Sequence, residues 1–154
     1  MFIDRRPVEQ AWFEPESLDA IALWDVIEHF VDPRGVLEHL RPMLRPGGLL
    51  GVATIAHDSL MYRIYHGMRL TVPPLARRFG PLLYNPFHTY YFSRASLARL
   101  VRNAGFEIFE HRGYEFPLDR LKAAAPLKLA MRGLYLLQAL TSTQGEQYLF
   151  ARKA

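Results

Sequence analysis

Histidine side chains are the first candidates for proton-transfer chemistry in this sequence, because the unperturbed pKa of imidazole lies near neutral pH. His29 directly follows Glu28, and it could act as a general base toward a phenol or hydroxyl group. Successive residues on a helix point about 100° apart, so we do not expect Glu28 and His29 to act together on one ligand. Glu28 is instead expected to cap a helix or to brace a loop.

Metal coordination is a second kind of chemistry open to histidine. His29, His57 and His88 lack the short paired spacings of metal-ligand motifs, so we predict no metal site. The sequence has no cysteine, which excludes a disulfide framework, thiolate metal sites and a cysteine nucleophile. The absence of cysteine fits a reducing compartment, and the cytoplasm is the expected location.

The composition is that of one ordinary globular domain, with 154 residues of which 50% are hydrophobic and 22% are charged. No window approaches the roughly 18 apolar residues of a membrane-spanning helix, and charged residues at 4–6 interrupt any signal-peptide apolar region. We therefore expect neither a spanning nor a secreted chain. The net charge of +4 mildly favours acidic ligands or anionic lipid surfaces, and it is also ordinary solubilising charge.

Two apolar runs of strand length mark the expected sheet. Residues 18–24 predict a strand buried on both faces of a parallel sheet. Residues 49–55 predict the next strand, and a Pro-Gly-Gly turn at 46–48 precedes it. With a helix between them, these strands form a βαβ unit, and the alternation of strands and helices along the chain predicts an α/β fold.

The helix between these strands has a clear start signal. Asp32 is expected at the N-cap and Pro33 at the first helical position, where the missing amide hydrogen costs nothing. Apolar residues continue at helical spacing to Leu44. Pro42 is expected to loosen the last turn.

The second half of the chain continues the alternation. An aromatic and arginine-rich stretch at 57–84, interrupted by two prolines, predicts an inserted helical segment or lid. Ser93 is expected to cap another helix, and Gly105 to end it in a left-handed conformation. A third strand is expected at 106–111.

The last elements are a helical stretch and a strand. Helical spacing runs from Pro117 to about Leu140, and Pro126 and Gly133 are expected to break it. Residues 147–151 predict the last strand, which would suit antiparallel pairing at an edge as well as parallel pairing.

Two blocks of the sequence resemble class I S-adenosylmethionine-dependent methyltransferases of the ubiquinone-biosynthesis-like group, which includes methyltransferase types 11, 12 and 23. The first block reads LDAIALWDVIEH, then Asp-Pro, then LRPGG, within residues 18–48. The second reads PFHTYYFS and continues to AGF, within 86–106. The resemblance implies the C-terminal half of a Rossmann-like methyltransferase sheet with an inserted helical lid. It also implies S-adenosylmethionine as cofactor and a small-molecule or lipid-like methyl acceptor.

The resemblance places the methionine part of the cofactor beside the turn that follows residues 18–24. Ligands of open parallel sheets also bind beyond the carboxyl ends of the strands. Trp24, Asp25 and Val26 are therefore the expected cofactor-binding residues, with Trp24 as an apolar wall beside the sulfonium. The other interpretation of Trp24 is an aromatic residue that only caps the core.

The resemblance also directs attention to the borders of the inserted segment, where the family varies its substrate-binding residues. His57 and His88 stand on either side of this segment. Either could line an acceptor pocket together with Tyr91.

The glycine-rich turn that grips the cofactor in this family is not found in the sequence. Gly35, Gly47 and Gly48 belong to a helix and to a turn that leads into a strand. We therefore expect 1–154 to be a single partial methyltransferase domain, with 57–84 as inserted lid and without the N-terminal cofactor-binding half. It would be a truncated product, a chain that a partner chain completes, or a remnant with another role. Open apolar faces predict self-association or marginal stability.

The alternative function is a non-catalytic binding or membrane-surface module derived from a methyltransferase. Two segments mix basic and apolar residues, and helices of this kind rest on anionic bilayers or cover a substrate pocket as a lid. These basic residues carry no nucleic-acid recognition motif, so nucleic-acid binding is not expected. They are Arg63, Arg69, Arg77, Arg78, Lys122, Lys128 and Arg132.

Overall fold

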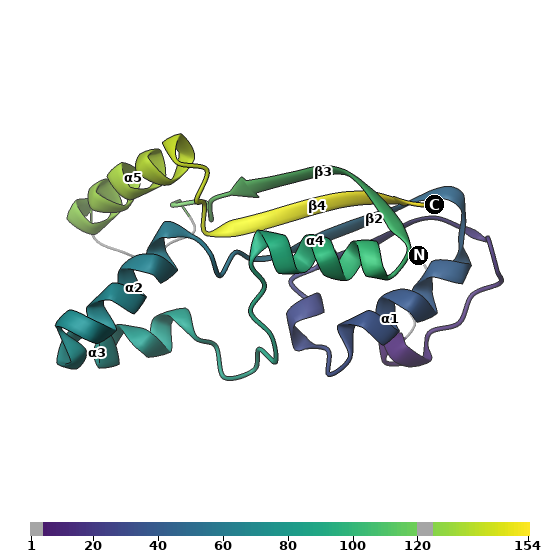
Figure 1. The fold of residues 1–154 in the computed structure, drawn as a ribbon, viewed down its shortest axis with the longest axis horizontal. Helices are drawn as coiled ribbons and strands as arrows, with labels where there is room; N and C mark the ends of the chain where they lie inside the picture. The colour runs from purple at the N-terminus through teal and green to yellow at the C-terminus, as the bar shows by residue number, and fades with distance from the viewer. Residues whose placement is uncertain (1–4, 120–124) are drawn as a thin grey trace.

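The computed structural model describes residues 5–119 and 125–154, which build a four-stranded sheet with helices on one face and at one end (Figure 1). The strand order is β1-β2-β4-β3. β1 pairs with β2 in parallel, whereas β4 runs antiparallel to both of its neighbours. The α/β expectation is confirmed, and the last strand lies inside the sheet rather than at its edge. The strands are β1 (Leu18–Trp24), β2 (Leu44–Ile55), β3 (Phe106–Tyr114) and β4 (Glu146–Lys153).

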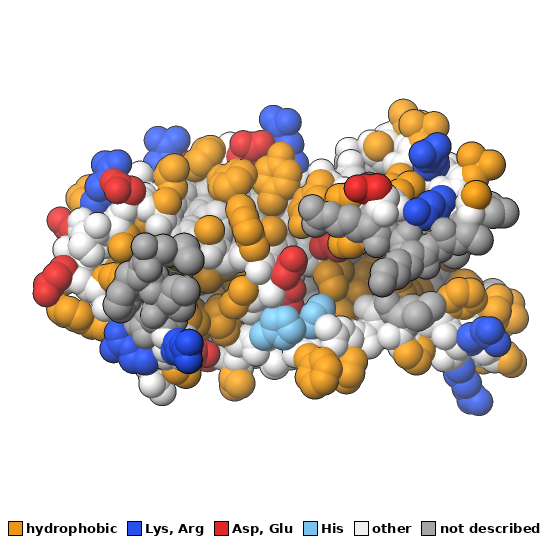
Figure 2. Space-filling model, turned by 180° about the vertical axis from the view of Figure 1, so that it is seen from behind, with side chains coloured by type: hydrophobic (Ala, Val, Ile, Leu, Met, Phe, Trp, Pro, Cys, Tyr) orange, Lys and Arg blue, Asp and Glu red, His pale blue; other side chains and the backbone are white. Residues whose placement is uncertain are grey.

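Two helices, α1 (Pro33–Leu40) and α4 (Arg94–Asn103), pack side by side on one face of the sheet (Figure 1). The opposite face, seen in Figure 2, carries exposed hydrophobic side chains. The prediction that β1 is buried on both faces is therefore wrong. Leu23 points into the core, but Trp24 points to the open face and is 50% exposed.

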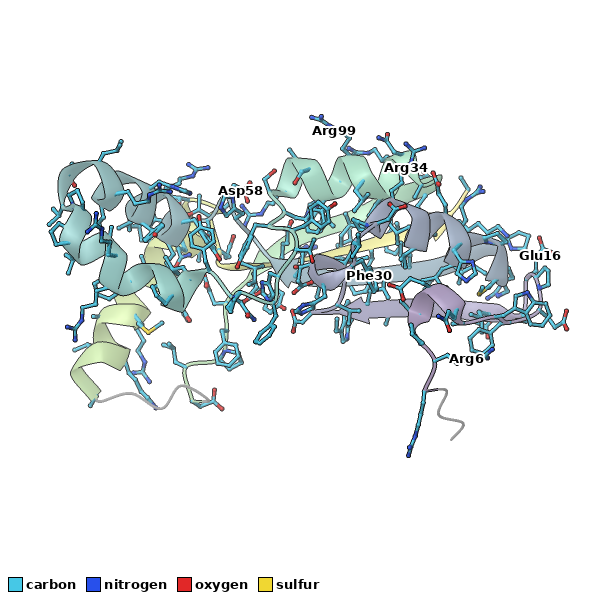
Figure 3. The ribbon with its side chains drawn as sticks, turned by 90° about the horizontal axis from the view of Figure 1, so that it is seen from below. Arg6, Glu16, Phe30, Arg34, Asp58 and Arg99 are labelled. Carbon is cyan, nitrogen blue, oxygen red and sulfur yellow. The ribbon has the colours of Figure 1, made fainter. Side chains whose placement is uncertain are left out.

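Helix starts follow their sequence signals. The Asp32 carboxylate accepts a hydrogen bond from the Gly35 amide at 2.9 Å, and the Ser93 hydroxyl accepts one from the Ser96 amide at 3.1 Å. The start of α4 has a further bond, from the Arg94 amide to the Asp58 carboxylate at 3.3 Å. Asp58 lies where the inserted helices meet α4 (Figure 3).

Two boundaries differ from the prediction. α1 ends at Leu40 and gives way to a 3-10 turn, Arg41–Met43, because Pro42 has no amide hydrogen to continue the α-helical ladder. β2 already begins at Leu44, so the Pro-Gly-Gly turn lies within the strand as an irregularity. Gly47 has φ 71° there, a conformation that glycine adopts at little cost.

The end of α4 agrees with its prediction. Gly105 has φ 86° directly after the helix, as a left-handed C-terminal residue requires. β3 then runs to Tyr114, three residues beyond the predicted end, because β4 pairs with it over this whole length.

The inserted segment forms a helical hairpin of α2 (Leu60–Thr71) and α3 (Pro73–Leu83). It lies at the same end of the molecule as α5 (Ala125–Leu140) (Figure 1). The predicted break at Gly133 is wrong, because a glycine inside a helix costs only about 1 kcal/mol and α5 runs through it. Pro126 lies in the first turn of α5, where a proline is tolerated. Residues 117–119, the start of the predicted helical stretch, are not helical. Residues 121 and 122 of the predicted stretch lie outside the described residues.

No helix in the described ranges combines the length and the apolar character needed to cross a membrane.

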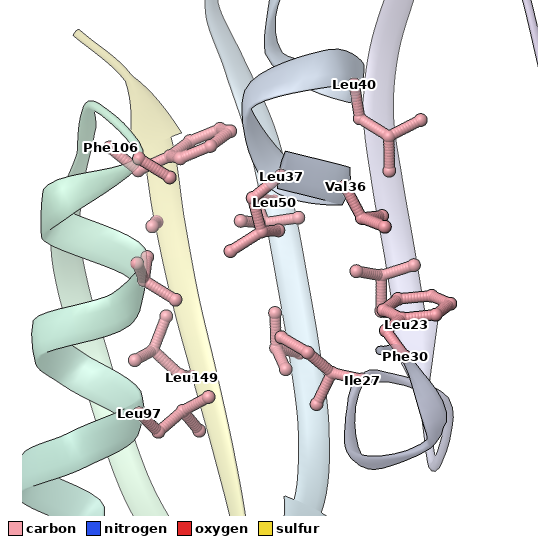
Figure 4. Close-up of a cluster of buried hydrophobic side chains, with 14 of the residues drawn as sticks. Leu23, Ile27, Phe30, Val36, Leu37, Leu40, Leu50, Leu97, Phe106 and Leu149 are labelled. Atoms are coloured by element: carbon pink, nitrogen blue, oxygen red, sulfur yellow. The ribbon is translucent and has the colours of Figure 1, made fainter. Parts of the chain in front are cut away.

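The core lies between the sheet and the pair α1 and α4 (Figure 4). β4 contributes Leu149, which is fully buried. It packs with other side chains that are 5% exposed or less, among them Leu23, Ile27, Leu37, Leu50 and Leu97.

Leu149→Ala should lower the free energy of unfolding by about 2–5 kcal/mol, because it leaves a cavity beneath the central strands. Urea denaturation measures this loss. The matched control is Leu136→Ala on α5, where the side chain is 63% exposed and the expected change is within about 0.5 kcal/mol. Equal losses at both positions would contradict the assignment of the core.

Candidate active site

The turn after β1 holds two of the three expected cofactor-binding residues against a hollow of the open face. Asp25 has φ 52°, and its amide donates to the Ala53 carbonyl at 3.0 Å, so the chain bends sharply at the carboxyl end of the strand. Trp24 and Asp25 line a hollow of about 440 Å³ together with Tyr114, Tyr148 and Phe150. Val26 follows at 36% exposure and is not among the residues that line it.

Gly51 lets the rings of Trp24 and Phe150, which form the floor of this hollow, lie close to the sheet. A Cβ atom at Gly51 would stand 3.0 Å from the Phe150 ring and 3.1 Å from the Trp24 ring. The two rings meet edge to face, with centroids 6.0 Å apart, a favourable geometry for an aromatic pair. Any larger residue at position 51 would push these rings away from the sheet.

The loop after the inserted helices is fastened to the turn that carries His29. The Glu28 carbonyl accepts hydrogen bonds from the amides of Thr89 at 2.8 Å and Tyr90 at 3.0 Å. The Tyr90 hydroxyl donates to the Val31 carbonyl at 3.1 Å. Glu28 thus braces a loop as expected, through its backbone rather than its side chain.

This docking brings Glu28, His29 and His88 together, whereas the sequence offered no reason to place Glu28 and His29 at one site. The residues Ile27–His29 form a 3-10 turn rather than an α-helix, and potential ligand atoms of the three side chains lie within 4.8 Å of one another. The Glu28 side chain is 2% exposed, and its Oε2 atom has no hydrogen-bond partner among the described residues. Two imidazoles and a carboxylate could hold a divalent cation or share a proton.

The His29 ring is oriented by the same loop. Its Nδ1 atom lies 2.9 Å from the Phe87 carbonyl, which can only accept, so Nδ1 carries the proton. In the neutral form of this ring, the Nε2 atom keeps its lone pair. His29 is exposed, and a general base needs both this lone pair and access to the substrate.

Ring contacts join the expected substrate residues into one cluster. Tyr91 lies between His57, with ring centroids 5.7 Å apart, and His88, at 5.4 Å. The Nε2 atom of His57 is 3.0 Å from the Tyr84 hydroxyl. Burial lowers the pKa of His57, and the neighbouring His66 lowers it further, so His57 is neutral at neutral pH.

A second cavity, of about 170 Å³, lies where the carboxyl end of β2 meets β4, α2 and α5, and no sequence pattern marked it. Its lining includes Ser59, Tyr62, Glu115, Phe116, Tyr135 and Glu146. Burial raises the pKa of Glu146 to about 7, and the carboxylates of Asp25, Glu28 and Glu115 add to this shift. Burial also raises the pKa of Glu115.

The two hollows are neighbours on the open face. Successive side chains of a strand alternate between faces, so Glu146, Tyr148 and Phe150 form one row along β4. Tyr114, which lines the first hollow, pairs with Glu146, which lines the second. Figure 2 shows acidic and histidine side chains close together near the middle of this face.

Glu146→Gln should stabilise the fold at pH 8 and have little effect at pH 5. A carboxyl whose pKa is about 7 in the folded protein and lower in the unfolded chain makes stability fall as pH rises between these two values. Removing the charge removes that loss, so the melting temperature of the variant should exceed that of the parent by about a few degrees at pH 8. Thermal melts at pH 5, 6, 7 and 8 measure the difference. In the control variant Glu107→Gln, at an exposed position of β3, the difference from the parent should not grow with pH.

Comparison with known proteins identifies the family to which this chain is similar. Residues 3–111 match the family described as methyltransferase domain. Over 110 residues the chain is 31% identical to the ubiquinone biosynthesis O-methyltransferase of Cupriavidus pinatubonensis, covering 70% of this chain and 42% of that protein. The chain spans about two-fifths of the length of the curated relative just named.

Solved structures share the fold at low sequence identity. A SAM-dependent methyltransferase of Thermotoga maritima superposes with a TM-score of 0.63 at 18% identity, covering 99% of this chain and 64% of that one. Phosphoethanolamine N-methyltransferase 2 of Haemonchus contortus, solved with S-adenosyl-L-methionine, superposes with a TM-score of 0.53 at 16% identity. The match covers 96% of this chain and 36% of that one. The expected Rossmann-like fold is confirmed.

The match to the methyltransferase domain covers well over half of the chain. The chain therefore belongs to the methyltransferase domain family.

Proposed function

We propose that this domain takes part in methyl transfer from S-adenosylmethionine to a small-molecule or lipid-like acceptor, with the methyl donor in the hollow beside Trp24. The observation that carries the proposal is the position of Trp24 and Asp25 at the carboxyl end of the parallel pair β1 and β2. This is where open α/β sheets bind ligands. The chain would contribute one wall of the donor site.

The residues of the hollow suit the chemistry of the donor. The sulfonium is a cation, which the face of an indole ring attracts, and Trp24 offers such a face. Asp25, next in the chain, supplies a carboxylate for the positively charged amino group of the methionine part. Catalysis of methyl transfer depends mainly on alignment of acceptor and methyl group, so walls of fixed shape contribute directly to the rate.

We further propose His29 as the general base for a hydroxyl acceptor. Its Nε2 atom would take the hydroxyl proton while the oxygen lone pair forms the new bond to the methyl carbon and the carbon–sulfur bond breaks. The Phe87 carbonyl holds the ring in the tautomer that this step needs. His57, His88 and Tyr91 would form the adjoining wall of the acceptor site, with α2 and α3 as its lid.

Trp24→Ala should weaken binding of S-adenosylhomocysteine by about tenfold or more, since the product keeps the contacts of the donor's methionine part with this wall. Isothermal titration calorimetry at about 100 µM protein measures the change in affinity for both S-adenosylmethionine and S-adenosylhomocysteine. Trp12→Ala is the matched control, because Trp12 is 58% exposed and lies away from the hollow. Equal affinities for the two variants would place the donor elsewhere.

The open sheet face supports a second proposal, contact with a further copy or with a partner chain. Trp24, Leu49 and Phe109 are 50%, 45% and 48% exposed on this face. Exposed apolar patches of this kind mark interaction surfaces. The alternative of a membrane-surface module has its own support in α5, where Leu129, Leu136 and Leu140 are 69%, 63% and 76% exposed.

Sedimentation velocity over a range of concentrations should show reversible self-association that Phe109→Glu weakens. Val31→Glu, at a position that is 81% exposed outside the sheet, should leave it unchanged. A monomer at all concentrations would contradict self-association. Pelleting of the chain with anionic vesicles at low salt would favour the membrane-surface alternative.

A further inference from the structure

The cavity between β2, β4, α2 and α5 differs in charge from the rest of the molecule. The chain as a whole carries a net charge of +4. Among the described residues that line the cavity there is no Lys, Arg or His, whereas Glu115 and Glu146 both line it. The site is therefore a local concentration of negative charge in a basic protein.

No described cation is paired with either carboxylate. The Glu115 Oε2 atom accepts a hydrogen bond from the Gly145 amide at 3.2 Å, and its Oε1 atom is buried without a partner. The charge of Arg94 lowers the pKa of Glu115, but the Arg94 guanidinium donates its hydrogen bonds to the Ser142 carbonyl and to Gln144. Within the described ranges, neither glutamate forms an ion pair.

The buried hydroxyl of Ser59 is a separate observation that indicates a polar ligand in this cavity. Ser59 lines it with no exposed surface, and within the described part of the chain its hydroxyl has no hydrogen-bond partner. A buried hydroxyl without a partner costs free energy, and a bound donor or acceptor would satisfy it. Ser59 stands at the start of α2, on the side of the cavity that the inserted helices form.

The remaining walls are apolar and aromatic, with Ile55, Met61 and Leu83 as the aliphatic part. Tyr62, Phe116 and Tyr135 line the cavity, and the charges of Glu115 and Glu146 both act on Tyr135. Aromatic faces attract organic cations, and they provide apolar surface for a carbon skeleton. Carboxylates and aromatic rings together are the surroundings that a protonated amine prefers.

We propose that this cavity is an acceptor subsite for a small organic ammonium compound, with Glu146 and Glu115 binding its charged nitrogen, the aromatic walls its carbon skeleton and the Ser59 hydroxyl a polar group. The inference rests on the proposed function, since it names the class of acceptor that reaches the donor hollow. The cavity is next to that hollow, because Glu146 pairs with Tyr114 across β3 and β4. The volume of about 170 Å³ limits the ligand to about a single ring.

The test compares two probes of nearly the same shape, 2-phenylethylamine and 2-phenylethanol, by isothermal titration calorimetry on the full chain at pH 8. The amine should bind at least about tenfold more tightly than the alcohol, because only the amine forms charge-assisted hydrogen bonds with the carboxylates. Glu146→Gln should remove most of this preference. Glu115→Gln is a second variant with the same expected direction, and Glu107→Gln is the control outside the cavity. Circular dichroism melts confirm that each variant is folded.

The outcomes separate this inference from the proposed function. Equal binding of the two probes, binding of neither, or an unchanged preference in both folded cavity variants would overturn the ammonium subsite. A parallel titration with S-adenosylhomocysteine judges the donor site by itself. If that titration shows binding while the amine does not bind, only the ammonium subsite fails; if only the amine binds, the donor site fails and the ammonium subsite stands as a binding site.

Discussion

The double pairing of β4 is the interaction on which the rest of the structure depends. This strand lies between β2 and β3 and forms antiparallel ladders with both. Without it, β3 and the helix α4 before it would have no link to the parallel pair β1 and β2 through the sheet. Leu149 and Ala151 on one face of β4 complete the core, while Tyr148 and Phe150 on the other line the hollow beside Trp24.

The same strand connects the fold to the site through two adjacent residues. Gln147 points to the covered face, where its amide donates to the carbonyls of Ile55 and Phe92 at 3.1 and 3.0 Å. Its side-chain oxygen lies 2.9 Å from the Nε2 atom of His111. Glu146 points to the open face and into the second cavity. The loop at Phe92, which also carries Tyr91 and His88, is thus fixed to the strand whose first residue is the acidic group.

Local patterns predicted the elements, whereas the site depends on contacts that no local pattern records. Asp32, Ser93 and Gly105 each act within a few residues, so their caps could be predicted from the sequence. The hydrogen bond between the His29 ring and the Phe87 carbonyl joins positions that are 58 residues apart. No local pattern marks Glu146, because its neighbours Ile55 and Tyr114 lie on two other strands that are distant in the sequence. The exposure of β1 was missed for a related reason, since a run of apolar residues does not tell how many faces of a sheet are covered.

The position of β4 also sets an order of events in folding. Ile55 pairs with Glu146, so the central ladder closes a loop of about 90 residues, and contacts of such long range slow folding. During synthesis β1, α1 and β2 can assemble as a local unit, but β3 waits unpaired until β4 has left the ribosome. Over that interval the apolar side chains of β3 and α4 are open to chaperones and to the same strands of neighbouring nascent chains.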